Sequence, residues 1–245
     1  EQPSWIGFSL NYLTQALCTF AMVGFLRREW PGIKLVLGGG LVTSWMRRPH
    51  WKNPFNGLVD HVMAGPGEAP LLSIFNIQHG AFHFRPDYDS LPIRNYFAPG
   101  PILPYSSSTG CYWNRCSFCP ERAEGNPYIA IPADEVIQDL LHLVDKQKPV
   151  LIHLLDNAIS PSIMKAICEH SLGVPWYGFA RLTWHLTDRD FCRSLKQSGC
   201  VMLQLGLESG DQTVLDDLQK GVNLEEVSSA LKNLKEAGIA AYVYL

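Results

Sequence analysis

Short apolar runs alternate with helical patterns along most of the chain, and this alternation limits the fold more than any other feature of the sequence. From residue 105 onward the predicted strands are 105–109, 150–156, 175–181, 201–208 and 239–245, and the predicted helices are 132–146, 161–171, 187–198, 211–219 and 224–237. Signals that start or stop helices, such as Pro132 and Gly238, stand at the boundaries. Strands that are each followed by helices predict a parallel, barrel-like βα array with its active residues at the carboxyl ends of the strands.

The first part of the chain shows a shorter version of the same order. The pattern predicts a strand at "WIGFSL", a helix from Thr14 to Trp30, a strand at "IKLVLGGG", a further apolar stretch at 58–65 and a helix at 71–77. Glycines follow the strands, which is typical of an open parallel sheet that binds a ligand at its carboxyl edge.

Prolines and glycines between these two parts interrupt any regular pattern. We therefore expect an α/β chain with a partial Rossmann-like domain at 1–85, a proline-rich linker at 86–104 and a partial TIM barrel at 105–245. Because the chain opens on a strand and stops inside an apolar run, we also expect it to be a fragment of a longer protein.

Charge and hydropathy give no sign of nucleic-acid binding or of a membrane span. The chain has 20 Lys and Arg against 23 Asp and Glu, a net charge of −3, so it has no basic field for nucleic acid or anionic membranes. Its longest apolar run, from Ala16 to Leu26, is too short to span a bilayer. No secretory signal is visible, and seven cysteines do not suggest a disulfide framework, so we expect a cytoplasmic protein.

Three cysteines stand within nine residues in "CYWNRCSFC", namely Cys111, Cys116 and Cys119. A structural zinc ion needs four ligands, and the remaining cysteines (Cys18, Cys168, Cys192 and Cys200) are scattered through apolar stretches and are interpreted as buried. Three thiolates suit a 4Fe-4S cluster in which the fourth iron is free for an outside ligand. A zinc site, another iron–sulfur site and a loop without metal remain as alternatives.

The string "STGCYWNRCSFC", with Phe118 before its last cysteine, and the later "LGLESGDQTVLDDLQKG" resemble the radical SAM superfamily, and its methylthiotransferase-like barrels in particular. The common spacing there is C-x3-C-x2-C, whereas this chain has C-x4-C-x2-C. The resemblance implies that the three cysteines hold a 4Fe-4S cluster, which cleaves S-adenosylmethionine reductively to a 5′-deoxyadenosyl radical. It also implies an electron donor such as flavodoxin or ferredoxin.

The same resemblance implies that Phe118, Arg181, Glu208 and Ser209 help to bind S-adenosylmethionine, and it assigns no catalytic residue beyond the cluster ligands. For Arg181, at a strand end, a structural salt bridge is the alternative to a cofactor carboxylate. For Glu208 and Ser209 the alternative is capping of the helix at 211–219. Asp156 and Asn157 end a predicted strand, where many radical SAM enzymes carry a Gly-Gly-Glu motif for the cofactor's amino group. Because this chain has "LLDNAIS" there instead, we interpret the pair as a helix cap before Pro161.

The first domain has a family resemblance of its own. The strings "IGFSLNY", "VLGGG" and "VMAGPGEAP" resemble the cobalamin-binding domain that precedes many radical SAM barrels. That likeness implies that Ser9, Gly38, Gly39 and Gly40 surround cobalamin, which then delivers a methyl group to an unactivated carbon or assists a rearrangement. A radical SAM enzyme without bound B12, and a non-catalytic iron–sulfur or zinc module for redox sensing or scaffolding, are the alternatives. The substrate stays unassigned.

Overall fold

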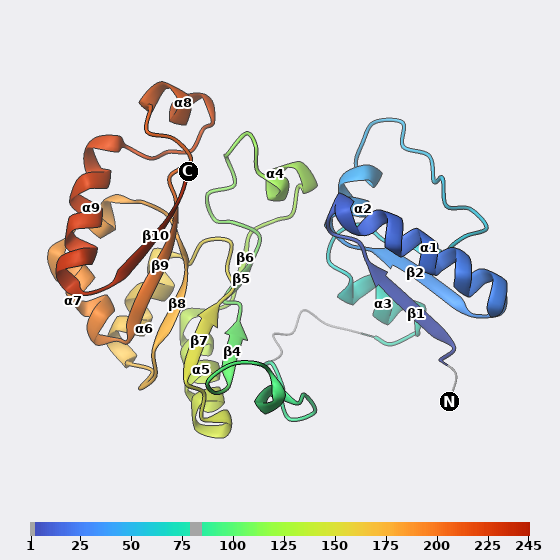
Figure 1. The fold of residues 1–245 in the computed structure, drawn as a ribbon, viewed down its shortest axis with the longest axis horizontal. Coiled ribbons are helices and arrows are strands. Elements are labelled where there is room, and N and C mark those ends of the chain that lie inside the picture. Colours follow the sequence, from blue (N-terminus) through green and yellow to red (C-terminus); the bar gives the residue numbers. More distant parts are fainter. Residues whose placement is uncertain (1–2, 79–84) are drawn as a thin grey trace. The chain divides into compact units, whose positions relative to one another are not determined.

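The computed structural model describes residues 3–78 and 85–245 (Figure 1). The chain divides into two compact units, one of Glu1–Phe82 with Pro120–Asn126 and one of His83–Cys119 with Pro127–Leu245. A short segment that directly follows the third cysteine of the loop therefore belongs to the first unit.

The first unit is a three-stranded parallel sheet with helices. Its elements are β1 (Trp5–Ser9), α1 (Leu13–Glu29), β2 (Lys34–Gly38), α2 (Gly40–Met46), β3 (His61–Val62), α3 (Glu68–Ile74) and α4 (Pro120–Glu124). The strands lie in the order β1-β2-β3, and the register places Ser9 opposite Gly38. The predicted parallel sheet is confirmed, and its strand ends meet at one edge as expected.

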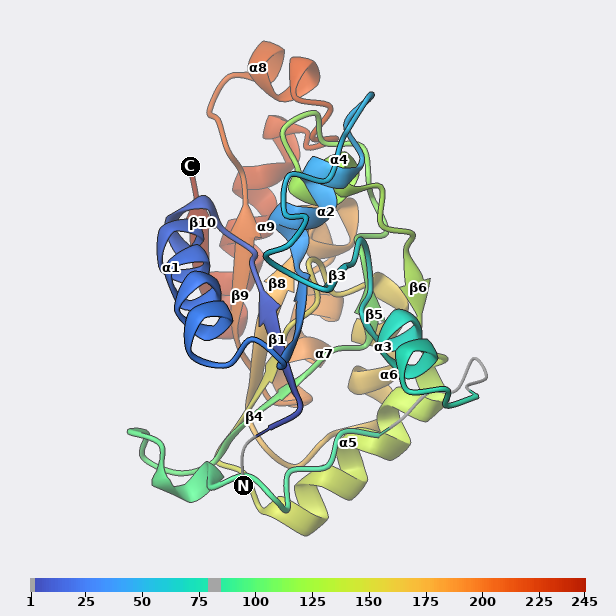
Figure 2. The ribbon, with the colours of Figure 1, turned by 90° about the vertical axis from the view of Figure 1, so that its right-hand side faces the viewer.

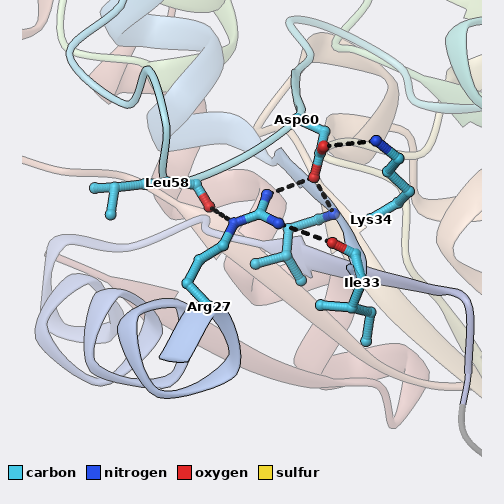
Figure 3. Close-up of polar contacts among 6 residues, drawn as sticks. Arg27, Ile33, Lys34, Leu58 and Asp60 are labelled. Carbon is cyan, nitrogen blue, oxygen red and sulfur yellow. Dashed lines mark hydrogen bonds and ion pairs between the residues drawn. The ribbon is translucent and has the colours of Figure 1, made fainter. Parts of the chain in front are cut away.

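The carboxylate of Asp60 links three elements of the first unit through hydrogen bonds (Figure 3). Its carboxylate accepts hydrogen bonds from the Arg27 side chain at the end of α1, from Lys34 Nζ at 3.1 Å and from the Leu35 amide at 2.8 Å. Burial by itself raises the pKa of Asp60, but the hydrogen bonds from Arg27, Leu35 and Lys34 outweigh it and hold that pKa well below its usual range. The end of α1 and the starts of β2 and β3 are thus linked through one carboxylate.

Helix α2 was not expected from the sequence. The glycines of "LGGG" indicate a strand end, yet α2 begins at Gly40, directly after that strand. Gly39 has a φ of 103°, and a Cβ there would lie 2.6 Å from the carbonyl oxygen of Leu10. The turn from strand to helix therefore requires glycine at this position.

The second unit contains the longer βα array. Its elements are η1 (Ile93–Asn95), β4 (Ile102–Tyr105), β5 (Ser108–Thr109), β6 (Ile129–Ala130), α5 (Ala133–Gln147), β7 (Leu151–Leu154), α6 (Pro161–His170), β8 (Trp176–Ala180), η2 (Trp184–Thr187), α7 (Arg189–Gln197), β9 (Cys200–Gly206), α8 (Gln212–Asp217), α9 (Leu224–Ala237) and β10 (Ala240–Tyr244). Five parallel strands form a sheet in the order β10-β9-β8-β7-β4, which confirms the partial barrel.

Helices α5, α6, α7 and α9 pack side by side in chain order on one face of this sheet, as Figure 1 and Figure 2 show. The strand residues that point toward them are buried, as in β8, where Trp176 is fully buried and Ala180 is 4% exposed. Residues between them, such as Tyr177 and Phe179, lie on the opposite face and are only partly buried. This alternation is the half-buried strand pattern expected for a barrel wall.

The first barrel strand differs from the prediction of 105–109. Strand β4 spans Ile102–Tyr105, so it begins inside the predicted linker of 86–104, and Pro104 is tolerated because β4 is an edge strand. The next strand, β5, leaves the sheet and pairs antiparallel with β6. The chain turns here because Ser107 and Ser108 bind a buried carboxylate at the end of β7.

Across residues 3–78 and 85–245, no helix combines the length and apolar character that crossing a membrane requires.

Candidate functional site

The cysteine loop leaves β5 at Gly110 and runs to Cys119. Gly110 has a φ of 71°, and a Cβ there would lie 2.6 Å from the carbonyl oxygen of Pro127, so the exit from the strand requires glycine. Cys116 is buried, whereas Cys111 and Cys119 are partly exposed, and all three are free thiols. The loop thus presents three thiols that no disulfide consumes.

The donor set of this loop fits an iron–sulfur cluster. Within the described ranges, no three side chains of His, Cys, Asp or Glu are already gathered closely enough to hold a metal ion. Three thiols within nine residues nevertheless provide the soft ligands that iron–sulfur clusters take. The fit therefore rests on the chemistry and spacing of the donors, and the thiols have to converge when a cluster binds.

The start of the loop is fastened to the end of β7 by Asp156, which is 1% exposed. Its carboxylate accepts hydrogen bonds from the Ser107 amide at 3.1 Å, from Ser107 Oγ at 2.7 Å and from Ser108 Oγ at 2.6 Å. The interpretation of Asp156 as a helix cap was wrong, because Ser160 caps α6 through a bond from the Ile163 amide to its Oγ.

Arg181 follows β8 and reaches the middle of the cysteine loop. Its Cζ lies 4.2 Å from the centre of the Trp113 ring, and its Nη2 donates a hydrogen bond to the carbonyl oxygen of Lys220. The side chain is 7% exposed, and no described group accepts a hydrogen bond from its Nε. Among the described residues Arg181 has no carboxylate partner, and it contacts an aromatic ring and a carbonyl instead of forming a structural salt bridge. Its role in cofactor binding stays a prediction.

Lys220 joins the predicted cofactor residues to one another, and our sequence reasoning missed it. Lys220 is 8% exposed, and its Nζ lies 2.8 Å from Glu208 Oε1 and 5.6 Å from the centre of the Phe118 ring. Phe118 itself is 49% exposed. The Lys220 ammonium thus lies between a carboxylate and an aromatic ring beside Cys119. An anionic group of a ligand can form a charge-assisted hydrogen bond with it there.

Glu208 and Ser209 lie directly beyond β9. Glu208 has a φ of 71°, a region that non-glycine residues seldom adopt, and its amide donates to the carbonyl oxygen of Tyr244 at 3.0 Å. Neither residue caps α8, since Asp211 accepts the capping hydrogen bonds from Thr213 and Val214. Ser209 Oγ accepts a hydrogen bond from the Asp211 amide at 3.1 Å. The helix-cap alternative is therefore wrong for both Glu208 and Ser209.

Tyr112 and His153 are two titratable groups of this unit. Burial raises the pKa of Tyr112 to about 12, although the nearby Arg181 guanidinium acts in the opposite direction. His153 stacks on Tyr177 with ring centres 4.2 Å apart, and burial lowers its pKa, so the imidazole is neutral at physiological pH. Both side chains therefore stay uncharged at neutral pH.

The predicted cobalamin residues lie at the carboxyl edge of the first unit's sheet. Ser9 ends β1 and Gly38 ends β2, and the two are neighbours in the parallel register. Asn11, which we had not predicted, links this edge: its Nδ2 donates to Ser9 Oγ at 3.2 Å, and its Oδ1 accepts from the Gly40 amide at 2.9 Å. Gly39 makes the turn into α2. The four predicted residues are thus brought together, and their contact with a ligand stays a prediction.

We interpreted the four remaining cysteines as buried, and the structure bears this out fully for two of them and partly for a third. Cys192 and Cys200 are buried in the core of the second unit, and Cys168 is partly buried against it. The interpretation was wrong for Cys18, which is exposed on α1.

Comparison with curated proteins gives two relatives at low identity. An uncharacterized methyltransferase of Pyrococcus horikoshii is 26% identical over 164 residues, which are 64% of this chain and 35% of that protein. The anaerobic magnesium-protoporphyrin IX monomethyl ester cyclase of Rubrivivax gelatinosus is 26% identical over 191 residues, 73% of this chain and 32% of that protein. The chain thus spans about a third of the length of these relatives.

Two solved structures share the fold over nearly the whole chain. The cobalamin-dependent S-adenosylmethionine radical enzyme OxsB with aqua-cobalamin bound has a TM-score of 0.69 at 17% identity, over 99% of this chain and 41% of that one. The radical S-adenosylmethionine methyltransferase TsrM from Kitasatospora setae has a TM-score of 0.70 at 15% identity, over 99% of this chain and 56% of that one.

The family model described as the radical SAM superfamily matches residues 105–245, more than half of the chain. That range contains the cysteine loop, Arg181 and Glu208. A 4Fe-4S cluster and S-adenosylmethionine are the cofactors that this family implies, and the three free thiols described above suit the cluster. The chain belongs to the radical SAM superfamily.

Proposed function

We propose that this chain is the cofactor-binding part of a radical SAM enzyme, with Cys111, Cys116 and Cys119 as the ligands of its 4Fe-4S cluster. The observation that carries the proposal is the loop with three free thiols, fastened at the edge of the sheet where β7, β8 and β9 end. This is the edge at which enzymes with parallel barrels hold their reacting groups.

Cys111, Cys116 and Cys119 would hold the cluster, which would pass one electron from a protein donor to S-adenosylmethionine for reductive cleavage of its C5′–S bond. The protein contributes orientation and exclusion of water. Lys220 is the cation available to the cofactor's carboxylate, and Glu208, Ser209 and Arg181 supply further polar contacts. Phe118 covers the site beside Cys119.

We further propose that the first unit binds cobalamin at the edge formed by Ser9, Gly38, Gly39 and Gly40. Bound cobalamin would supply the methyl group for transfer to an unactivated carbon. The fold shared with OxsB, a cobalamin-dependent S-adenosylmethionine radical enzyme, and with TsrM, a radical S-adenosylmethionine methyltransferase, supports this proposal. The relative from Pyrococcus horikoshii is also named a methyltransferase.

The clustered free thiols favour a reducing compartment, so we propose a cytoplasmic enzyme with a low-potential protein donor such as flavodoxin or ferredoxin. The class of substrate stays open in this proposal.

The radical chemistry is tested with anaerobically reconstituted full-length protein, a strong reductant and S-adenosylmethionine. We expect 5′-deoxyadenosine from the wild type and none from Cys116→Ala. Cys168→Ala is the matched control, because it removes a thiol of the same unit outside the loop. A wild-type protein that holds a cluster and yields no 5′-deoxyadenosine would instead indicate a non-catalytic iron–sulfur module.

Cobalamin binding is tested by the absorbance of the full-length protein after reconstitution with hydroxocobalamin. A Cβ at Gly38 would meet only ordinary van der Waals contacts with Met63, at 3.6 and 3.9 Å, so the backbone has room for a side chain there and Gly38→Val adds bulk at the proposed edge. Gly7→Val is the control, since Gly7 lies in β1 with open space around it. We expect Gly38→Val to lose cobalamin and Gly7→Val to keep it. A wild type that takes up no cobalamin would favour a radical SAM enzyme without B12.

A further inference from the structure

Trp113 anchors the spacer between Cys111 and Cys116 near its middle. Its indole Nε1 donates a hydrogen bond to the carbonyl oxygen of Gln219 at 2.9 Å. Two guanidinium groups lie over its ring, with Cζ of Arg181 at 4.2 Å and Cζ of Arg115 at 5.1 Å from the ring centre. The tryptophan is therefore held by one directional hydrogen bond and by cation–π contacts.

The turn that follows α8 is shaped to receive this ring. At Gly221 a Cβ would lie 2.1 Å from Cζ2 of Trp113, so no other residue leaves room for the indole. The carbonyl oxygen of Lys220, in the same turn, accepts a hydrogen bond from Arg181. A further bond runs from the Ser117 amide to the carbonyl oxygen of Leu218 at 2.9 Å. The turn 218–221 thus binds the loop at two places, at Trp113 and at Ser117.

Between Trp113 and Cys116, one residue of the spacer adopts a left-handed backbone conformation. Asn114 has a φ of 46°, in the left-handed region that asparagine tolerates better than most residues. The spacer of four residues is longer than the spacer of two between Cys116 and Cys119. Without an anchor, the longer spacer would leave Cys111 more mobile than Cys119. Bringing the Cys111 thiolate to a cluster would then cost more conformational entropy.

We propose that Trp113 is the positioning residue that allows the C-x4-C spacing to bind a cluster. Packed against Arg181 and the turn 218–221, it fixes the spacer so that Cys111 and Cys116 are presented to the same cluster. This inference rests on the proposed function, because it assumes that the loop binds an iron–sulfur cluster.

The test measures iron transfer from reconstituted full-length protein to a chelator, together with the EPR spectrum of the reduced cluster. Both are recorded without S-adenosylmethionine, so any contact of Arg181 with that cofactor does not enter. We expect Trp113→Ala to lose iron about tenfold faster than wild type and to show an altered spectrum, as is common for groups that support metal ligands. Trp113→Phe keeps a ring and loses the N–H donor, so we expect about a threefold effect.

Trp184→Ala is the matched control, because Trp184 is 64% exposed, stacks on His185 and lies outside the loop. We expect it to behave as wild type. If Trp113→Ala does not fold, Arg181→Lys replaces it, because lysine lacks the planar guanidinium that stacks on the indole. Wild-type iron transfer in folded Trp113→Ala, or in Arg181→Lys, would overturn the inference. A wild type that binds no cluster would instead refute the proposed function.

Discussion

Replacing Asp156 with asparagine tests whether a buried carboxylate holds the start of the cysteine loop. The two oxygens of Asp156 accept three hydrogen bonds, from the Ser107 amide and from the hydroxyls of Ser107 and Ser108. Asparagine offers one carbonyl oxygen and an NH2 group that donates, so at least one donor loses its acceptor. A hydrogen bond to a charged group contributes about 1.5–3 kcal/mol. Since 1.4 kcal/mol is a factor of ten, local opening should become about ten- to a hundredfold more frequent.

Hydrogen–deuterium exchange of the full-length protein measures this opening directly. We expect peptides that cover residues 105–119 to exchange about ten- to a hundredfold faster in Asp156→Asn. Asp145→Asn is the control, because it removes the same charge from a side chain that is 86% exposed and pairs with Lys148 at the surface. If exchange of the loop is the same in Asp156→Asn, Asp145→Asn and wild type, the carboxylate does not hold the loop.

Three further changes have calculable effects. The pKa of Asp60 is lowered in the folded state. Its contribution to the free energy of unfolding is therefore complete above the unfolded pKa of about 3.9 and is lost as the pH falls through the folded pKa. The melting temperature of the first unit should fall in acid, and it should fall less in Asp60→Asn. Gly221→Ala places a Cβ against Trp113 at a φ of 65° and should destabilise the second unit by about 1–3 kcal/mol in thermal melts. Glu208→Ala leaves the buried Lys220 without its carboxylate, which should destabilise the unit by about 1–3 kcal/mol, with Glu208→Gln closer to wild type.

The order of the elements was predictable because each one carries its own local signal. Strand β8 was predicted at 175–181 and spans Trp176–Ala180, and α9 was predicted at 224–237 and spans those residues. Helix α2 was missed because its start depends on how Gly39 packs against the backbone of Leu10, which no local pattern reveals. The early end of β4 depends likewise on Asp156, about fifty residues along the chain.

The residues of the candidate site that follow strands could be predicted from the sequence, whereas contacts between distant loops could not. Arg181 and Glu208 follow strands, and the barrel topology brings such ends to one edge. Trp113 carries no local signal of its contacts, since its hydrogen bond to Gln219 joins residues 106 positions apart. Lys220 lies in the turn after α8, and its pairing with Glu208 depends on the path of that turn. Gly221, directly after Lys220, was the signal in the sequence that another group packs closely against this turn.

The remaining thiols of the second unit bear on the choice between a zinc site and an open iron–sulfur cluster. Burial raises the pKa of Cys168 and Cys192 to about 11 and that of Cys200 to about 12, so all three stay protonated at neutral pH. Cys192 and Cys200 also belong to the apolar core, where drawing out a thiolate would disrupt packing. A tetrahedral zinc site would need a fourth ligand that these cysteines are poorly suited to supply. A cluster bound by Cys111, Cys116 and Cys119 would need no fourth cysteine, because its fourth iron would stay open for an outside ligand.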